Sequence, residues 1–190
     1  MKTIPTSIPD VLVFEPAVFA DERGWFSESF NEQRFNDALR EFNLPAPGPF
    51  VQDNHSCSSR GVLRGLHYQV APHAQGKLVR VVKGSAFDVA VDIRPGSPTF
   101  GRWAGEVLNA ANHRQLWIPA GFAHGFLALE DDTHFLYKTT RYYAKACERS
   151  LLWNDDALNI AWPLEGLSAL VATKDAEAPV LAGINLAELA

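Results

Sequence analysis

The sequence lacks any apolar run that approaches the roughly 20 residues of a membrane-spanning helix. Its first residues, 1–14, carry one lysine and two prolines but no apolar core of the kind that a signal peptide needs. We therefore expect a cytoplasmic protein with no membrane partner. Cysteine is also scarce: Cys57 and Cys147 stand far apart and match neither a zinc-binding nor a CxxC redox spacing, so free thiols are expected.

The chain also lacks an excess of basic residues, since its formal net charge is -5. Such a charge argues against non-specific binding to nucleic acid, which requires a basic surface that displaces counterions. The stretch 60–83 is different, because it contains basic residues and no Asp or Glu. Its basic residues are Arg60, Arg64, Lys77, Arg80 and Lys83. This pattern predicts a local site for a small polyanion, although a solvated basic face without a ligand would look the same.

Internal repeats, low-complexity tracts and linkers are absent as well, and the Pro/Gly clusters are short enough to be turns. With 47% hydrophobic and 21% charged residues, the composition is that of an ordinary globular protein. We therefore expect one domain over residues 1–190. The clearest helix is predicted at about 31–42, where apolar residues recur at a spacing of three and four and Asn31 is a candidate cap. A second, weaker helix is possible near the C-terminus.

Most of the middle of the chain has the alternation of β-strands. Phe87, Val89, Val91 and Ile93 would point to one side of a strand and the residues between them to the other. Similar short runs occur at 62–70, 77–83, 103–108, 114–118, 125–129, 133–140 and 149–153. About eight short strands predict a β-sandwich or barrel. Exposed edges of such a fold need cover, and the segment before the helix could supply it by pairing with a second subunit.

The segment 61–69 places Arg64 and His67 three residues apart, which would send them to opposite faces of a regular strand. Gly65 between them is a natural place for a bulge that turns both side chains the same way. A guanidinium suited to phosphate and an imidazole suited to proton transfer would then share one cavity. Taken alone, a histidine such as His67 is more often a core residue with its hydrogen bonds satisfied than a base.

Two further clusters bear on the chemistry. Residues 117–126 have the Pro-x-Gly-x-x-His form of the second cupin motif, in which the histidine, here His124, usually binds metal. The stretch that would supply the other ligands offers only one histidine, His67, so we expect no metal site. Residues 133–140 place Tyr137 on one face of a strand, where a tyrosine is more often a packing residue than a catalytic one.

Together these segments resemble the deoxythymidine-diphosphate-4-dehydrorhamnose 3,5-epimerase family. The resemblance runs from about Ile8 to Asp175 and includes the segments 21–28, 52–56, 60–69, 76–77 and 96–101 besides the two clusters. It implies a mainly β, cupin-type jelly roll with a few short helices. It also implies a homodimer that needs no cofactor and acts on a deoxythymidine-diphosphate (dTDP) 4-keto-6-deoxyhexose in the third step of rhamnose donor synthesis.

The same resemblance implies roles for individual residues. His67 matches the family's base, Asp175 the aspartate that holds this imidazole, Tyr137 the proton donor and Lys77 the lysine beside the keto oxygen. The positions that match contacts to nucleotide, diphosphate or sugar are Arg23, Glu28, Gln52, Asp53, Asn54, Arg64, His124, Glu148 and Lys174. The chain departs from the pattern at Cys57, where an arginine is common, and in its Ala-rich tail after residue 175.

The expected reaction inverts C3 and C5 of the sugar. Both carbons are alpha to the C4 ketone, so each can lose a proton to give an enolate that a cation stabilises without a metal. Inversion needs a base and an acid on opposite faces, and an imidazole can accept at neutral pH while a phenol stays protonated. Inversion of C3 or C5 alone, isomerisation of the ketone and a cupin that only binds a sugar remain as alternatives.

Overall fold

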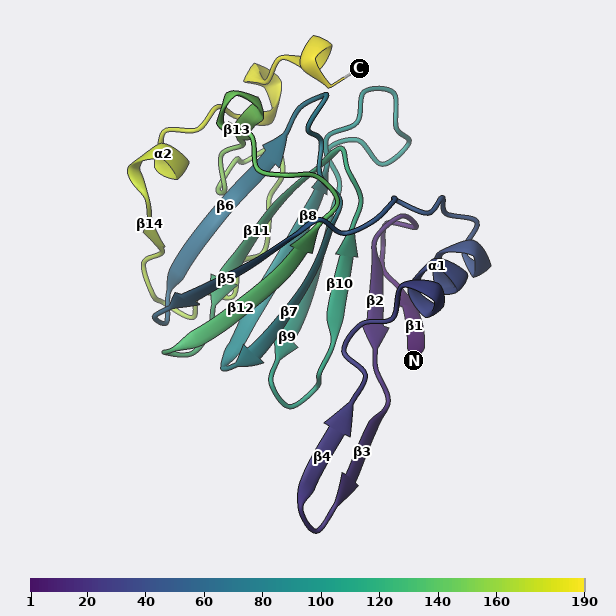
Figure 1. Cartoon of the computed structure of the whole chain (residues 1–190). Helices are drawn as coiled ribbons and strands as arrows, with labels where there is room; N and C mark the ends of the chain where they lie inside the picture. The colour runs from purple at the N-terminus through teal and green to yellow at the C-terminus, as the bar shows by residue number, and fades with distance from the viewer. Residues whose placement is uncertain (190) are drawn as a thin grey trace.

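Two facing β-sheets form the body of the molecule in the computed structural model, which describes residues 1–189 (Figure 1). The first sheet has the strand order β1 (Lys2–Pro5), β2 (Leu12–Glu15), β10 (Gln115–Ile118), β7 (Lys77–Lys83), β12 (Thr133–Thr139) and β5 (Gln52–Ser58). The second has the order β13 (Glu148–Ser150), β6 (Val62–Gln69), β11 (Phe122–Ala128), β8 (Ser85–Asp92) and β9 (Trp103–Asn109). In the second sheet β14 (Leu170–Val171) also pairs with β6 in parallel. This is the jelly-roll sandwich that the sequence predicted.

Apolar side chains from both sheets fill the space between them. Val79, Val81 and Phe135 of the first sheet meet Ala90 and Phe126 of the second, all nearly or fully buried. The rings of Phe126 and Phe135 stack with centroids 4.0 Å apart. Because this core belongs to both sheets, it fixes their separation and the shape of the space that remains at its open side.

The outer face of the second sheet is buried as well. Val89, Val91 and Ile93, the side chains that the alternation grouped together, pack against the C-terminal part of the chain, including Leu158 and Ile184. Strand β8 is therefore apolar on one side because the C-terminal segment covers it, while its other side faces the inter-sheet core. This covering segment ends in short helical turns, η2 (Leu181–Gly183) and η3 (Leu186–Glu188).

Helix α1 (Glu32–Glu41) confirms the helix prediction. The side chain of Asn31 accepts a hydrogen bond from the backbone N–H of Arg34, as an N-cap residue does. The buried face of the helix, with Phe35 and Leu39, covers the outer side of the first sheet around Trp117. The weaker C-terminal helix is α2 (Thr173–Ala176), and η1 (Lys145–Cys147) is a further short turn.

Six strands were not anticipated: β1 to β5 and the short β14. Strands β1 and β2 extend the chain's own first sheet beside β10. Strands β3 (Val18–Asp21) and β4 (Gly24–Ser27) form a hairpin that projects away from the body (Figure 1). Strand β5 has no apolar alternation and forms the free edge of the first sheet, where polar residues are typical.

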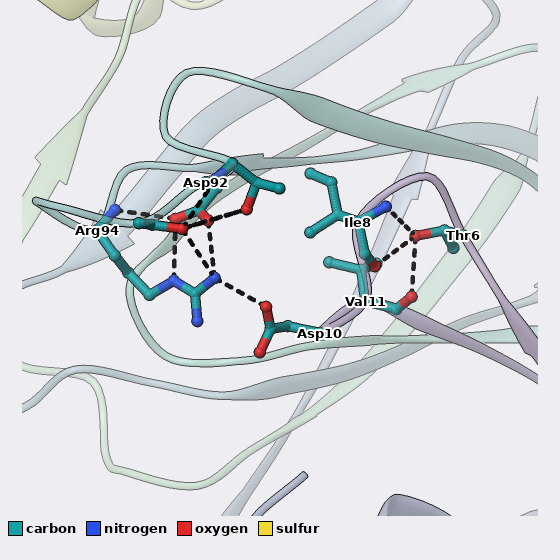
Figure 2. A network of polar contacts seen from close by, with 8 residues as sticks. Thr6, Ile8, Asp10, Val11, Asp92 and Arg94 are labelled. Atoms are coloured by element: carbon teal, nitrogen blue, oxygen red, sulfur yellow. Dashed lines mark hydrogen bonds and ion pairs between the residues drawn. The ribbon is translucent and has the colours of Figure 1, made fainter. Parts of the chain in front are cut away.

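A polar network around the buried carboxylate of Asp92 ties the turn after β1 to the loop after β8 (Figure 2). Arg94 donates to both carboxylate oxygens of Asp92, at 2.9 and 2.7 Å, and to Asp10 at 2.9 Å. The hydroxyls of Ser97 and Thr99 each donate to Asp92 at 2.6 Å. Burial alone would raise the pKa of Asp92, but these hydrogen bonds lower it to about 2.

We predict that Asp92→Asn lowers the free energy of unfolding by about 3 kcal/mol at pH 7, because Arg94 would lose its buried partner. The pKa of Asp92 is lower in the folded protein, so the difference between the two proteins should persist at neutral pH and shrink as the pH falls from about 4 toward 2. Urea denaturation checks this. Asp10→Asn is the control, because Asp10 is partly exposed, and a cost equal to that of Asp92→Asn would contradict the prediction.

No helix among residues 1–189 is long and apolar enough to cross a membrane. Cys57 and Cys147 are both free thiols, as the sequence predicted. The assignment of residues 1–190 to one domain includes residue 190, which lies outside the described residues, and it stays a prediction.

Candidate active site

A cavity of about 500 Å³ opens between the two sheets, above the apolar core. Both sheets and helix α2 contribute side chains to it. Nine residues that the sequence singled out line this cavity: Asn54, Arg64, His67, Lys77, His124, Tyr137, Glu148, Lys174 and Asp175. Residues far apart in the chain are therefore brought to one place, in a space large enough for a sugar and part of a nucleotide.

Gly65 produces the bulge that the sequence predicted. In the pairing of β6 with β11, His67 lies opposite His124 and Arg64 opposite Phe126, so three steps on β6 match two on β11. Gly65 has φ of +125°, and a Cβ built there would come within 2.6 Å of the Cα of Gly125. Only glycine fits this close approach, and the extra residue turns both Arg64 and His67 into the cavity.

His67 forms a hydrogen-bonded pair with Asp175. The His67 Nε2 atom lies 2.6 Å from Asp175 Oδ1, and the other carboxylate oxygen accepts the backbone N–H of Gly65 at 3.2 Å. Burial would raise the pKa of Asp175, but these hydrogen bonds and the nearby positive charges hold it below its usual value. An ionised Asp175 orients the ring with a proton on Nε2 and leaves Nδ1 free to accept another.

Lys77 is almost fully buried in the cavity wall, and its Nζ donates to the backbone carbonyl of His67 at 3.3 Å. Burial lowers its pKa to about 8, against the opposing charges of Asp88 and Glu148. At neutral pH Lys77 is therefore still mostly an ammonium. Such a buried cation interacts strongly with negative charge that develops beside it.

Tyr137 lies on β12, in the sheet opposite His67. Burial raises the pKa of its phenol, and the negative charge of Glu148 acts in the same direction while Arg64 opposes it. The phenol therefore stays protonated well above neutral pH. A sugar between the sheets would have the imidazole on one side and this hydroxyl on the other, since the two strands belong to facing sheets.

Partly exposed charged groups lie at the mouth of the cavity. Lys174 Nζ lies 3.3 Å from Glu148 Oε1, and the hydroxyl of Tyr143 donates to Glu148 Oε2 at 3.2 Å. Arg64 donates to Ser58 and to the backbone carbonyl of Cys57. Of the basic stretch 60–83, Arg64 and Lys77 line the cavity, whereas Arg60 pairs with Glu165 at the surface.

The family model for dTDP-4-dehydrorhamnose 3,5-epimerase matches residues 5–183. The chain belongs to this family. It is 58% identical over 175 residues to the dTDP-4-dehydrorhamnose 3,5-epimerase of Shigella flexneri, covering 92% of this chain and 93% of the relative. Membership in the family makes the chain an isomerase of nucleotide-linked sugars.

Solved structures of relatives share the fold. The dTDP-6-deoxy-D-glucose-3,5-epimerase of Legionella pneumophila, solved in complex with dTDP-4-keto-L-rhamnose, matches with a TM-score of 0.92 and 49% identity, covering 99% of this chain and 96% of that one. A 3'-monoepimerase from Streptomyces bikiniensis, solved in complex with dTDP-quinovose, matches with a TM-score of 0.85 and 37% identity, covering 94% and 87%. The cupin-type jelly roll expected for an epimerase of this family is thus confirmed.

Four residues assigned by resemblance to the epimerase family do not line the cavity of this chain. Gln52 is close to it, because its side chain donates to Asn54 and accepts from the backbone of Tyr143. Asp53 alternates with these residues along β5 and points to the other face of the sheet, where it pairs with Lys138. The structure therefore gives Asp53 no contact with the cavity.

Arg23 and Glu28 lie even farther from the epimerase cavity within this chain. Arg23 is at the tip of the β3–β4 hairpin, with its side chain 85% exposed and paired with Asp21. Glu28 follows β4 and pairs with Arg34 of helix α1. The two residues are far from the cavity because the hairpin and the segment after it extend away from the body of the molecule instead of folding over it (Figure 1).

Sequence reasoning missed three residues that shape the epimerase cavity. Asp88 is fully buried and hydrogen-bonded to His124, and Tyr143 lies at the mouth. Gln69 holds the loop around Tyr143, since its side chain donates to the carbonyl of Tyr142 and accepts from the backbone N–H of Ala144. Asp88 had a signal in the sequence, since an acidic residue stands in the middle of the largely apolar strand 85–92. The other two had none, because their roles arise from contacts across the fold.

No group of three or more His, Cys, Asp or Glu side chains within residues 1–189 is placed to hold a metal ion. His124, the histidine of the cupin-like motif, is instead bonded to Asp88 through Nε2 at 2.7 Å. The expectation that this epimerase needs neither metal nor another cofactor stays a prediction.

Proposed function

We propose that the chain inverts C3 and C5 of dTDP-4-dehydro-6-deoxy-D-glucose, to give dTDP-4-dehydro-L-rhamnose, with His67 as base and Tyr137 as acid. One observation carries the proposal: an imidazole backed by a buried carboxylate shares a cavity with a phenol that burial keeps protonated. These groups come from facing sheets. That arrangement suits inversion, which removes a proton from one face of a carbon and returns one to the other.

The first chemical step is removal of the proton on C3 or C5 by Nδ1 of His67. Asp175 holds the other ring nitrogen and favours the imidazolium that results. The electrons of the broken C–H bond move onto the C4 carbonyl oxygen and give an enolate. Lys77 is the buried cation of the same cavity and stabilises this charge more than it does the neutral ketone.

The second step returns a proton from Tyr137 to the opposite face of the same carbon. The electron pair of the enolate takes the phenolic proton, and the C4 ketone re-forms. The phenolate that results regains a proton from solvent, and the imidazolium of His67 releases its proton to solvent. A ketone at C4 is restored after each inversion, so the same groups can act on the second carbon. Arg64 and Lys174 at the mouth are the cations available for the diphosphate, and the complex of the Legionella pneumophila relative supports a substrate of this class.

A single-carbon epimerase is the second candidate, because the Streptomyces bikiniensis relative, at 37% identity, is a 3'-monoepimerase. The two candidates use the same base, acid and cation. Incubation with the dTDP-linked 4-keto-6-deoxyglucose and product analysis by NMR distinguishes them. We expect inversion at both carbons; inversion at one would support the second candidate, and an unchanged substrate would leave only a sugar-binding cupin.

We also propose that the protein is a homodimer in which the β3–β4 hairpin of one subunit reaches the other. Phe19, Trp25 and Phe26 of the hairpin are 66%, 62% and 69% exposed, which is a large apolar surface for a lone chain. The cluster that α1 buries on the first sheet extends to Leu78 of β7 but includes no residue of β12 or β5, the two strands at that edge of the sheet. A partner's hairpin would bring Arg23 to a cavity that it does not reach in its own chain.

Mixed dimers test this arrangement. We predict that Arg23→Ala and His67→Asn chains, each of low activity alone, recover about a quarter of wild-type activity when they are unfolded and refolded together. Half of the dimers would be mixed, and each would have one cavity with His67 from one chain and Arg23 from the other. A protein that is monomeric by light scattering and still fully active, or a mixture that recovers no activity, would contradict the proposal.

The cytoplasmic location stays a prediction.

A further inference from the structure

Asp88 is the most unusual ionisable group near the cavity. It is fully buried on β8, its Oδ1 lies 2.7 Å from His124 Nε2, and its Oδ2 has no hydrogen-bond partner within residues 1–189. A buried carboxylate oxygen without a partner is costly and rare in folded proteins. The side chains around it at this level of the core are mostly apolar, with Phe126 directly opposite on β11. A role in the adjacent site would account for a carboxylate buried at this cost.

The contact with His124 defines which nitrogen of that ring carries the proton. Burial lowers the pKa of His124, against the pull of Asp88, so the ring is neutral at pH 7. A carboxylate accepts and cannot donate, so the single proton of the neutral ring lies on Nε2. Within residues 1–189 no hydrogen bond reaches Nδ1, and the ring lines the cavity. Its lone pair is therefore available to a donor in the cavity.

Asp88 is also one of two anions that act on Lys77, the other being Glu148 at the mouth. The charged and titratable groups that surround Lys77 and Asp88 come from every neighbouring element. They are Arg64 and His67 of β6, Glu106 of β9 paired with Arg114, His124 of β11, Tyr137 of β12, Glu148 of β13, and Lys174 and Asp175 of α2. Of the two anions that act on Lys77, Asp88 is fully buried, whereas Glu148 is partly exposed and pairs with Lys174.

We propose that Asp88 is a positioning residue for the epimerase reaction, which fixes His124 as a hydrogen-bond acceptor toward a sugar hydroxyl and keeps Lys77 in its ammonium form. This inference rests on the function proposed for the cavity. It assigns different tasks to the two imidazoles. His67, held by Asp175 at the side of the cavity, moves protons, whereas His124, held by Asp88 at its base, does not change its protonation during turnover.

The first test is the tautomer of His124 in the wild-type protein. We expect ¹⁵N NMR at pH 7 to show a neutral ring with its proton on Nε2, the signal being assigned by its loss in a His124→Gln variant. A proton on Nδ1, or on both nitrogens, would overturn the proposal. This measurement needs no variant of Asp88, so it holds even if that variant folds poorly.

The second test is the pH dependence of kcat/KM in Asp88→Asn. The pKa of Lys77 is about 8 in the wild type, and loss of a negative neighbour lowers it further, so the alkaline limb of the profile should move down by about one pH unit. Asp92→Asn is the matched control, because Asp92 lies on the same strand, is equally buried and faces a different network. Its profile should keep the wild-type limb.

The experiments distinguish a wrong role for Asp88 from a wrong epimerase function. If the wild-type protein turns over the keto-sugar and Asp88→Asn keeps the wild-type alkaline limb, the role of Asp88 is wrong and the epimerase proposal stands. If the wild-type protein gives no product, the proposed function is wrong, whatever the tautomer of His124. A general structural role for Asp88 would lower activity at every pH without moving the limb, and that outcome would also overturn the proposal.

Discussion

His67→Asn should abolish inversion and deuterium exchange together, lowering kcat/KM by about 1,000-fold. The Asn side chain fills the space of the part of the imidazole nearest the backbone. It cannot accept a proton at neutral pH, so the enolate would not form. His67 makes one side-chain hydrogen bond and is 27% exposed, so the variant should fold. NMR in deuterium oxide measures both quantities on one sample, because exchange at C3 or C5 reports the enolate and the product reports inversion.

His73→Asn is the matched control for this variant. His73 lies six residues along the chain, outside the lining of the cavity, and its contact with Gln69 uses the backbone carbonyl. Its activity should stay within about twofold of the wild type. Equal losses in the two histidine variants, or continued exchange in His67→Asn, would show that another group removes the proton.

The sequence predicted the parts of the site that depend on local geometry. Gly65 between Arg64 and His67 indicated a bulge, and the pairing of β6 with β11 has a register shift at this place. Asn31 and the spacing of Phe35 and Leu39 indicated helix α1, which has these residues as cap and buried face. In each case the physical cause lies within a few residues of the chain, so it can be read from the chain alone.

Other features depend on contacts that have no local signal. Strand β5 has a polar sequence and is a strand because β12 pairs with it along its length. Asp175 reaches His67 because β14 adds to the sheet beside β6 and delivers helix α2 to the cavity. Its role came from resemblance to the family, just before the tail that departs from the family's pattern, and the 2.6 Å contact supports that role.

The direction in which the Asp88 side chain points could not be predicted from the sequence. An acidic residue in an otherwise apolar strand usually faces solvent, and Asp88 faces the inter-sheet core because the C-terminal segment covers the other face of β8. Its partner His124 was assigned to the substrate by resemblance and to a failed metal motif by pattern. Within the cavity the pair Asp88–His124 and the pair Asp175–His67 have similar contacts, at 2.7 and 2.6 Å, but very different exposure.

The exposure of His67 also matters for the second large effect that we expect, which is that of Tyr137→Phe. This change removes the acid and leaves the base, so His67 can still form the enolate. The His67 side chain is 27% exposed, so the proton it takes can exchange with solvent before it returns to the same face. We predict that inversion falls by about 100-fold or more while deuterium enters C3 or C5 at a rate much closer to that of the wild type.

The ratio of exchange to inversion decides the role of Tyr137. A tyrosine that only packs or binds the sugar would, when changed to Phe, slow both processes by the same factor, because both begin with the same enolate. Tyr142→Phe is the control, since Tyr142 is 64% exposed and outside the lining of the cavity, and it should leave both rates unchanged. Parallel losses in Tyr137→Phe would remove the phenol from the acid's role and require another donor on that face, with His67 and the enolate left in place.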